Sequence, residues 1–235
     1  MQIVSFRRIE KKYLLTARQK ETLLARIGSR LTPDIHGEST IFSLYLDTPD
    51  HLLIRNSIDA DVYKEKLRLR SYGVPQEDTP VFLELKKKFD GVVYKRREVM
   101  PLGSARDYLR GGRKPTNSQI MEELDYAMRL YHRPKPAMLI MCERTAFYAE
   151  AHPDLRLTFD AAIRYREDKL AMEAGSQGKQ ILPDGMFLLE VKTGGAMPLW
   201  LADALDACRL YPVSYSKYGA AYLDTLRSAR QADPI

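Results

Sequence analysis

Basic residues recur at every second position in several short stretches of this sequence. In residues 64–72, KEKLRLRSY, strict alternation from Lys66 to Arg70 places three cations on one side of an extended chain and two leucines on the other. A strand of this kind usually buries its apolar face and exposes its polar face to water. Every polar position from Lys66 to Arg70 is positive, however, and this favours a charged interior face over a solvated exterior.

Six other predicted strands also carry charged side chains on the faces that they share with these cations, and most of these charges are positive. The cations are Arg8, Lys12, Lys64, Lys66, Arg68, Arg70, Lys86, Lys88, Lys95, Arg97, Arg144, Arg156 and Lys192, and the anions are Glu10, Glu84, Asp160 and Glu190. Thirteen cations and four anions leave an excess of nine positive charges, against a formal net charge of +6 for the whole chain. The basicity is therefore concentrated in the strands.

The common explanation of one such strand is a solvated face of an antiparallel sheet. Like charges directly opposed across strands are destabilising, which weakens that explanation for the set as a whole. Helices need the leucine faces to pack on, so the basic faces are expected to line an interior, and a closed barrel would also remove the sheet edges. The ligand that suits such an interior is a polyphosphate held by Arg and Lys.

The four acids allow two interpretations. Glu190, in the segment LLEVK, could form a salt bridge with a neighbouring arginine, or it could bind a hard cation. Carboxylates that hold Mg²⁺ or Mn²⁺ beside phosphates are a usual arrangement. Glu190 is the first candidate metal ligand, followed by Glu10, Glu84 and Asp160.

The elements that would position these residues can be predicted from periodicity and turn signals. Strands are expected over residues 5–15, 40–46, 64–72, 81–88, 92–100, 137–148, 155–165 and 186–193, and helices over 16–29, 52–54, 104–110, 116–131, 198–210 and 216–230. Thr16 and Gln19 have capping-box spacing, and Asp90-Gly91 predicts a hairpin. The prediction is an α+β fold in a single domain, residues 1–235, with about eight antiparallel strands in a closed tunnel-like barrel and helices packed outside.

The overall composition excludes fewer classes of function than the charge pattern of the predicted strands does. The basic sequence, with a pI near 9.2, suggests a polyanionic partner without distinguishing nucleic acid, phosphate chain or membrane surface. Cys142 and Cys208 lie in apolar segments and are expected to be buried thiols in a reducing compartment, hence a cytoplasmic protein. We expect no signal peptide and no membrane span. The four histidines lack metal-ligand spacing, and no Walker-type loop or nucleophile motif is present.

Several segments together resemble the VTC domain, the polyphosphate polymerase domain of the vacuolar transporter chaperone family. They are residues 8–13, 67–72, 82–86, 143–147, 155–160, 189–192 and 214–218. The resemblance extends in order from about Arg8 to Leu226. That family belongs to the CYTH-like triphosphate tunnel metalloenzymes, which implies a tunnel of eight antiparallel strands that holds a triphosphate or polyphosphate with a divalent metal.

The resemblance also implies roles for individual residues. The residues that would grip phosphate during catalysis are Lys12, Arg68, Arg70, Lys86, Lys95, Arg144, Arg156 and Lys217. Further substrate contacts are expected from Arg8, Lys66, Lys88, Arg97, Lys192 and Ser216. Glu190 would hold Mn²⁺ or Mg²⁺, and Lys217 with Ser216 would close one tunnel end.

The function implied is a transferase that moves the γ-phosphate of ATP, or another nucleoside triphosphate, to a growing inorganic polyphosphate chain. Ser214 stands where the polymerase has a second lysine, and Arg8 stands where hydrolytic members have an acid two residues before Glu10. The presence of Arg8 in place of that acid favours phosphoryl transfer over hydrolysis. The alternatives are a tripolyphosphatase or nucleoside triphosphatase of the same fold, and a non-catalytic polyphosphate-binding module. A nucleic-acid partner is not expected, because the cations alternate along strands and do not cover one helix or loop.

Overall fold

The structure is a computed structural model and describes residues 9–232 except Asp61 and Gly91. Its strands are β1 (Ile9–Thr16), β2 (Thr32–Asp47), β3 (Tyr63–Tyr72), β4 (Pro80–Phe89), β5 (Val92–Pro101), β6 (Lys135–Ala149), β7 (His152–Arg166), β8 (Lys179–Gln180) and β9 (Met186–Thr193). Its α-helices are α1 (Ala17–Ile27), α2 (Leu52–Asp59), α3 (Leu102–Leu109), α4 (Gln119–Leu130), α5 (Leu199–Ala207) and α6 (Lys217–Ala232). The described part thus confirms the predicted α+β class.

The strands are joined by hydrogen bonds in the order β1-β9-β7-β6-β2-β3-β4-β5, and β8 pairs with β7. The pairings β1–β9, β9–β7, β2–β3, β3–β4 and β4–β5 are antiparallel. Within the described residues, β1 and β5 stand at the two ends of this path. A closed barrel therefore stays a prediction.

The chain divides into two compact units. The first contains the described residues of 1–39, 142–163 and 182–215, and the second contains those of 40–141, 164–181 and 216–235. Strands β2, β6 and β7 each contribute residues to both units. The prediction of a single domain over residues 1–235 stays a prediction.

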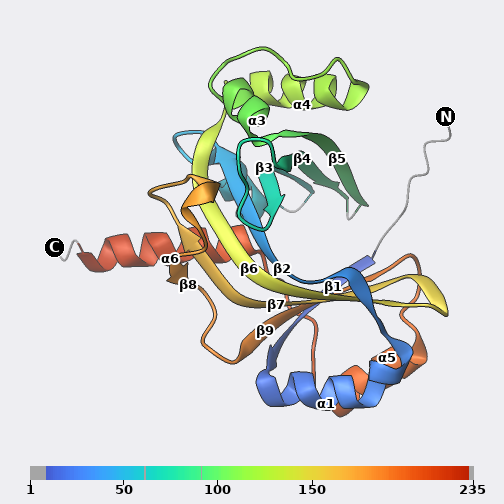
Figure 1. The fold of residues 1–235 in the computed structure, drawn as a ribbon. Coiled ribbons are helices and arrows are strands. Elements are labelled where there is room, and N and C mark those ends of the chain that lie inside the picture. Colours follow the sequence, from blue (N-terminus) through green and yellow to red (C-terminus); the bar gives the residue numbers. More distant parts are fainter. Residues whose placement is uncertain (1–8, 61, 91, 233–235) are drawn as a thin grey trace. The chain divides into compact units, whose positions relative to one another are not determined.

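The core of the first unit lies between its strands and the helices α1 and α5 (Figure 1). Tyr13 and Leu15 of β1 are buried there beside Leu23 of α1 and Leu201 of α5. The predicted capping box starts α1: the Thr16 hydroxyl accepts from the Gln19 amide, and the Thr16 amide donates to Gln19 Oε1. Because odd positions of β1 face this core, Glu10 and Lys12 lie on the other face.

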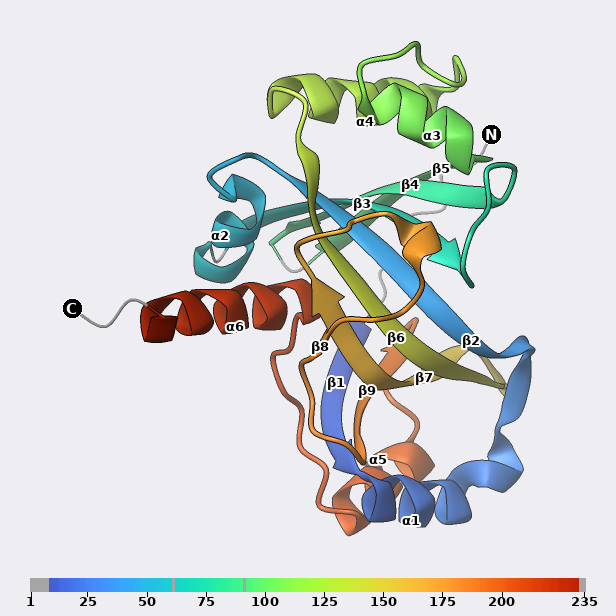
Figure 2. The ribbon, with the colours of Figure 1, turned by 60° about the vertical axis from the view of Figure 1, so that its left-hand side comes forward.

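The core of the second unit lies under the leucine face of β3 and β4 and is covered by α3 and α4 (Figure 1). Leu67, Leu69, Leu83 and Leu85 are almost completely buried, as the alternating pattern predicted. Helices α2 and α6 of this unit lie beside each other (Figure 2). Packing on the leucine face leaves the basic residues of β3 and β4 on the opposite face.

Three element predictions need correction. Strand β2 begins at Thr32, eight residues before the predicted start, because it continues through Pro33 and through Gly37 with φ of +52°. Strand β7 begins at His152, so the turn lies at residues 150–151 and not at the predicted residues 152–154. The two-residue strand β8 was missed because it is too short to show a period.

Candidate functional site

The register of the second unit arranges the basic face of β3, β4 and β5 in rows across the sheet. Lys64 lies opposite Lys88, and one step along the strands Lys66, Lys86 and Lys95 lie side by side. The next row contains Tyr45 of β2, Arg68, Glu84 and Arg97. A row of three lysines without an acid between them is repulsive, and this favours an anionic ligand.

Glu84 is the centre of this cationic face, and its side chain is 1% exposed. Its Oε2 accepts from Arg68 Nε at 2.7 Å and lies 4.0 Å from Arg70 Nε. Its Oε1 accepts from Arg97 Nε at 2.6 Å and lies 2.7 Å from Lys95 Nζ. One carboxylate therefore positions four cations, which leaves an excess of three positive charges.

The charged side chains around Glu84 interact strongly with one another because they are largely shielded from water. The side chains of Arg68 and Arg70 are only 17% and 11% exposed. Burial would raise the pKa of the Glu84 carboxyl, but Arg68, Arg70 and Lys95 hold it well below its usual range. Burial lowers the pKa of Lys95 to about 8; Arg97 and Arg68 act in the same direction, and Glu84 opposes them. This face therefore repels additional cations and favours anions.

Tyr45 connects the row of Arg68 and Glu84 to an aromatic pair. Its hydroxyl accepts from Arg68 Nη1 at 3.3 Å, and its ring is stacked on Tyr218 of α6 with centroids 4.3 Å apart. Burial would raise the pKa of Tyr45, but the charges of Arg68, Lys66 and Arg70 lower it to about 8. The stack fixes the hydroxyl beside the cations.

The start of α6 belongs to the same face. Lys66 Nζ donates to the Ser216 hydroxyl at 2.9 Å, and that hydroxyl accepts from the Gly219 amide at 3.1 Å. Tyr218 donates to Asp47, which also accepts from the Leu53 and Ile54 amides at the start of α2. These bonds hold the first turn of α6, with Ser216 and Lys217, beside the lysine row.

In the first unit, a second charged face is formed by β1, β9 and β7. One row contains Lys12, Glu190 and Thr158, and the adjacent row contains Glu10, Lys192 and Arg156. Lys12 Nζ donates to the Tyr215 carbonyl oxygen at 2.7 Å and lies 3.3 Å from Glu10 Oε1. Glu190 Oε2 lies 3.3 Å from Lys192 Nζ.

Arg144 of β6 joins the two acids of this face. It donates to both oxygens of Asp160, Nε to Oδ1 at 2.6 Å and Nη2 to Oδ2 at 2.7 Å. Its Nη2 also lies 3.9 Å from Glu190 Oε2. Burial would lower the pKa of Arg144, but Asp160 and Glu190 raise it above its ordinary value. The guanidinium is therefore always charged and fixed in orientation.

Residues 7–225 match the VTC domain family. The chain belongs to the VTC domain family. This family is grouped with the triphosphate tunnel proteins, enzymes that handle phosphate compounds and typically use divalent metals. No curated protein matches the chain. No helix in the part of the chain that the structure describes has the length and apolar character needed to span a membrane.

The chain is also similar to several solved structures. A Bacillus halodurans protein, described provisionally as an adenylate cyclase, shares 14% identity over 88% of this chain and 92% of its own, with a TM-score of 0.56. A Vibrio parahaemolyticus protein with the same provisional description shares 13% identity over 92% and 97%, with a TM-score of 0.46. The Mimivirus capping enzyme triphosphatase shares 8% identity over 86% and 88%, with a TM-score of 0.35.

The VTC domain brings most of the predicted site residues into two clusters, one in each unit. Arg68, Arg70, Lys95 and Arg97 surround Glu84 in the second unit, where Lys66, Lys86, Ser216 and Lys217 lie near them by register or contact. Lys12, Arg144, Lys192 and the acids Glu10, Asp160 and Glu190 form the cluster of the first unit. Their catalytic and binding roles stay predictions.

Two predicted residues lie apart from these clusters, and the placement of a third is not described. Lys88 is exposed at the end of β4. The Arg156 side chain is exposed and lies 3.4 Å from Asp34. Arg8 lies outside the described residues.

Tyr45 and Thr158 belong to the charged rows although sequence patterns did not indicate a site role for them. Thr158 is uncharged, and a tyrosine beside strand charges could stack a base but is more often a packing residue. Only the register places them beside the charges.

The four candidate metal ligands differ in how fully their oxygens are engaged. Both oxygens of Glu84 and both oxygens of Asp160 accept from cations. Glu190 and Glu10 have looser ion pairs, and they lie diagonally on neighbouring strands. The buried hydroxyl of Thr158, opposite Glu190, has no hydrogen-bond partner among the described residues. Two carboxylates and a hydroxyl fit a hard divalent cation that takes its other ligands from phosphates and water.

Among the described residues, no three His, Cys, Asp or Glu side chains gather as a metal site of their own. This is compatible with Mg²⁺ or Mn²⁺ held by few protein ligands, since such ions commonly enter with the substrate phosphates. Cys142 and Cys208 are buried, as predicted.

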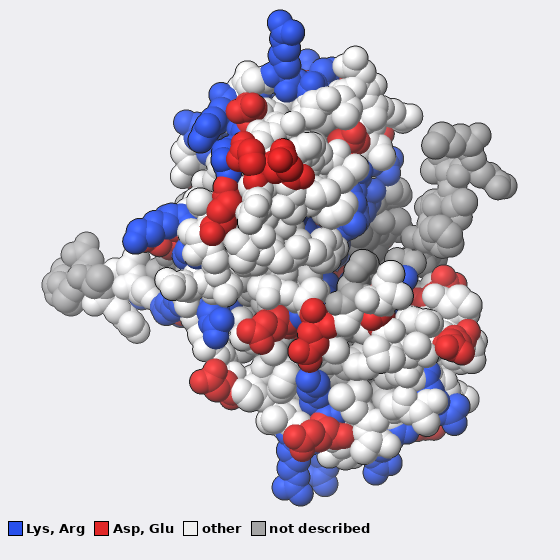
Figure 3. Space-filling view, in the orientation of Figure 1, with Lys and Arg blue, Asp and Glu red and all other residues white. Residues whose placement is uncertain are grey.

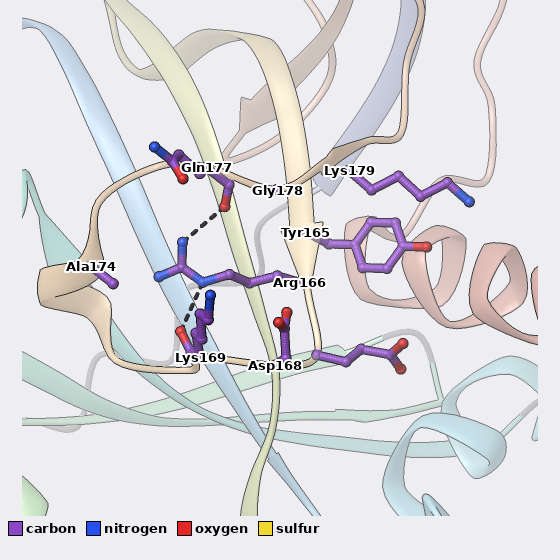
Figure 4. Close-up of a pocket in the computed structure, with 9 residues that line it drawn as sticks. Tyr165, Arg166, Asp168, Lys169, Ala174, Gln177, Gly178 and Lys179 are labelled. Atoms are coloured by element: carbon purple, nitrogen blue, oxygen red, sulfur yellow. Dashed lines mark hydrogen bonds between the residues drawn. The ribbon is translucent and has the colours of Figure 1, made fainter.

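A pocket elsewhere in the second unit has a structural explanation. It is lined by residues 165–169, by Ala174 and by residues 177–179 (Figure 4). The Arg166 guanidinium fills its side by donating to the carbonyl oxygens of Lys169, Ala171, Gly175 and Gln177 at 2.7–2.9 Å. Arg166 thus organises the loop between β7 and β8.

One face of the molecule carries charges of both signs. On the face shown in Figure 3, acidic and basic side chains are interspersed. This agrees with the excess of positive charge that the sequence places in the strands.

Proposed function

We propose that this VTC domain is a metal-dependent polyphosphate polymerase that transfers the γ-phosphate of ATP, or another nucleoside triphosphate, to a growing polyphosphate chain. The observation that carries the proposal is the cluster around Glu84, where one buried carboxylate positions Arg68, Arg70, Lys95 and Arg97. The charge of this cluster is complementary to several phosphates in a row. Family membership supports a phosphate compound as the ligand.

Phosphoryl transfer requires little covalent chemistry from the protein. Catalysis consists of holding donor and acceptor phosphates in line and neutralising the charge that develops on the transferred group. In this proposal the arginines Arg68, Arg70 and Arg97 hold the donor triphosphate, and the lysine row receives the neighbouring phosphates. Lys12, Arg144 and Lys192 of the first unit also bind phosphate oxygens. No side chain serves as a nucleophile.

A divalent metal is part of the proposal. Glu190 would hold Mg²⁺ or Mn²⁺, with Thr158 and Glu10 as the adjacent oxygen donors. Once bound, the metal neutralises charge on the transferred phosphoryl group. Ion pairs with Arg144 and Lys192 orient the Glu190 carboxylate.

The proposal includes a closed tunnel and a cytoplasmic location. Closure of the sheet would surround the basic faces with protein and exclude water from the phosphates, which strengthens each charge interaction. The two buried cysteines are in keeping with a reducing compartment.

The test is incubation of the purified protein with ATP and Mn²⁺, followed by gel electrophoresis for long phosphate chains. Chains are expected with the unaltered protein. Arg68→Ala should lower the rate about 10²–10³-fold, because it removes one charge-stabilising donor. Arg96→Ala is the matched control, since Arg96 lies on the opposite face of β5 and pairs with Glu123.

Other outcomes would replace the proposal. Release of free phosphate without chains would indicate a tripolyphosphatase or nucleoside triphosphatase. Tight binding of polyphosphate without turnover, unchanged in Glu190→Ala, would indicate a binding module.

A further inference from the structure

The two ends of the basic face of the second unit differ in residue type: one carries lysines and the other carries aromatic residues. Along β3 and β4 the rows begin with Lys64 and Lys88 and continue through the lysine row to Arg68 and Glu84. After these rows the character changes, because Arg70 lies opposite Phe82, and Phe82 lies opposite Val99. Tyr72, two residues beyond Arg70, ends the same face. A phosphate-binding surface therefore continues directly into an aromatic one.

The aromatic end is a small patch formed by Tyr72, Phe82, Arg97 and Val99. Tyr72 packs edge-to-face on Phe82 with ring centroids 5.7 Å apart. The Arg97 guanidinium lies over the Phe82 ring, 4.5 Å from its centroid, and Nη2 donates to the Tyr72 hydroxyl at 3.4 Å. Tyr72 and Val99 nevertheless stay exposed, with 45% of Tyr72 accessible. Packing within the protein thus leaves part of the patch uncovered.

Arg97 belongs to both regions. Its guanidinium is bonded to Glu84 and stacked on Phe82 at the same time. A planar cation held in this way can bind a phosphate oxygen at its edge and stack an aromatic ring on its free face. A ligand that crosses Arg97 therefore has anionic groups on one side and a flat ring on the other.

We infer that this patch binds the base of the donor nucleotide. The inference rests on the proposed function and specifies its donor as a nucleoside triphosphate. Two residues along a strand span about 7 Å, so Tyr72 lies about 14 Å along the strand from Arg68. This separation leaves one row, that of Arg70, for the sugar and the first phosphate.

The arrangement fixes the direction of the donor. Its base lies on Tyr72, its triphosphate runs past Arg97 and Arg68, and its γ-phosphate points toward Lys66, Lys86 and Lys95. The patch offers a flat apolar surface and a guanidinium, and stacking on such a surface tolerates every base. ATP and GTP are therefore both expected to bind, more tightly than pyrimidine nucleotides with their smaller rings.

The experiment compares the binding of ATP and of inorganic tripolyphosphate by calorimetry. Tyr72→Ala should weaken ATP binding by about 5- to 150-fold, the range for loss of one stacked base. Its tripolyphosphate binding should change less than about 2-fold, because tripolyphosphate has no base. Tyr72→Phe keeps the ring and should bind ATP like the unaltered protein.

Tyr94→Ala is the matched control for surface exposure. Tyr94 is 44% exposed and lies on the opposite face, opposite Lys87 in register. It should leave the affinity for both ligands unchanged. A second measurement requires no variant: 2-aminopurine riboside triphosphate should lose fluorescence on binding to the unaltered protein, because stacking quenches it.

The outcomes separate this inference from the proposed function. Equal loss of ATP and tripolyphosphate binding in Tyr72→Ala, or an equal loss in Tyr72→Phe, would overturn the base site, as would unquenched 2-aminopurine fluorescence. The proposed polymerase would still stand in those cases. If the unaltered protein bound neither ATP nor tripolyphosphate, the proposed function would fail first.

Discussion

At the scale of single residues, Glu84 explains how four cations can share one buried surface. Without it, Arg68, Arg70, Lys95 and Arg97 would repel one another at short range. With it, the side chains are oriented before any ligand binds, so little entropy is lost when phosphate arrives. Glu84 is for this reason better suited to position cations than to bind a metal. The sequence pattern alone also allowed the role of a metal ligand.

Lys95 and Tyr45 should make the stability of the protein depend on pH. Their pKa values in the folded protein are about 8, whereas in the unfolded chain they are about 10.5 and 10. Between pH 8 and 10 the unfolded chain binds more protons than the folded one, so the free energy of unfolding should increase with pH across this window. Urea unfolding at pH 7.5 and 9.5 measures the increase.

The matched variants are Lys95→Arg and Tyr45→Phe, which do not titrate in this window. Each should show a smaller increase than the unaltered protein. An increase of the same size in both would contradict the pKa values given for these two groups.

At the scale of elements, the sheet register decides which charges meet, and loops and helix ends complete the surface. Thr16 and Gln19 begin α1, and Asp47 receives the first amides of α2. Arg166 has the corresponding role for the segment between β7 and β8, where its guanidinium satisfies four carbonyl groups (Figure 4). Ala174 donates its amide to the Ala171 carbonyl within this segment, and the Arg166 side chain supplies the bonds to the four carbonyl groups.

Arg166→Lys should therefore loosen this loop while it keeps the positive charge. A lysine has one ammonium group and cannot reach four carbonyls in a fixed plane, so the cost should be about 1–3 kcal/mol of stability. Hydrogen exchange should become faster in residues 167–180. Arg227→Lys, on the exposed side of α6, should change neither quantity. Unaltered exchange in residues 167–180 would show that the loop is ordered by other contacts.

At the scale of the whole molecule, the basic charge lies in the strands, and the face shown in Figure 3 carries charges of both signs. The formal charge of +6 is thus a poor guide to the strength of the anion site, because the strands hold more positive charge than the total. Surface charges are screened by salt, and half-buried clusters are screened much less. A phosphate chain should consequently stabilise the fold even at physiological salt.

Tripolyphosphate should raise the unfolding temperature of the protein. At a ligand concentration 100 times Kd, the gain in unfolding free energy is about 2.7 kcal/mol. Thermal unfolding with and without tripolyphosphate measures this gain, and sulfate at equal ionic strength is the control. An equal shift of the unfolding temperature with sulfate would show that the sites bind any anion and do not recognise linked phosphates.

The sequence by itself determined the α+β class, most strands and helices, and the set of basic strand residues. Alternation has a period of two, so one strand is enough to show which side chains share a face. The resemblance carried by residues such as Arg68 and Arg70 indicated the family, and the match over residues 7–225 confirmed it. Long β2 was missed in part because Pro33 and Gly37 are typical of loops.

Only the tertiary structure decided which charges are neighbours. Register depends on pairing between strands that are far apart in the sequence, and no single strand contains that information. It placed Glu84 among four cations, Thr158 opposite Glu190, and Phe82 and Tyr72 beyond Arg70. The candidate site is therefore a property of paired strands, whereas its residue types are a property of each strand alone.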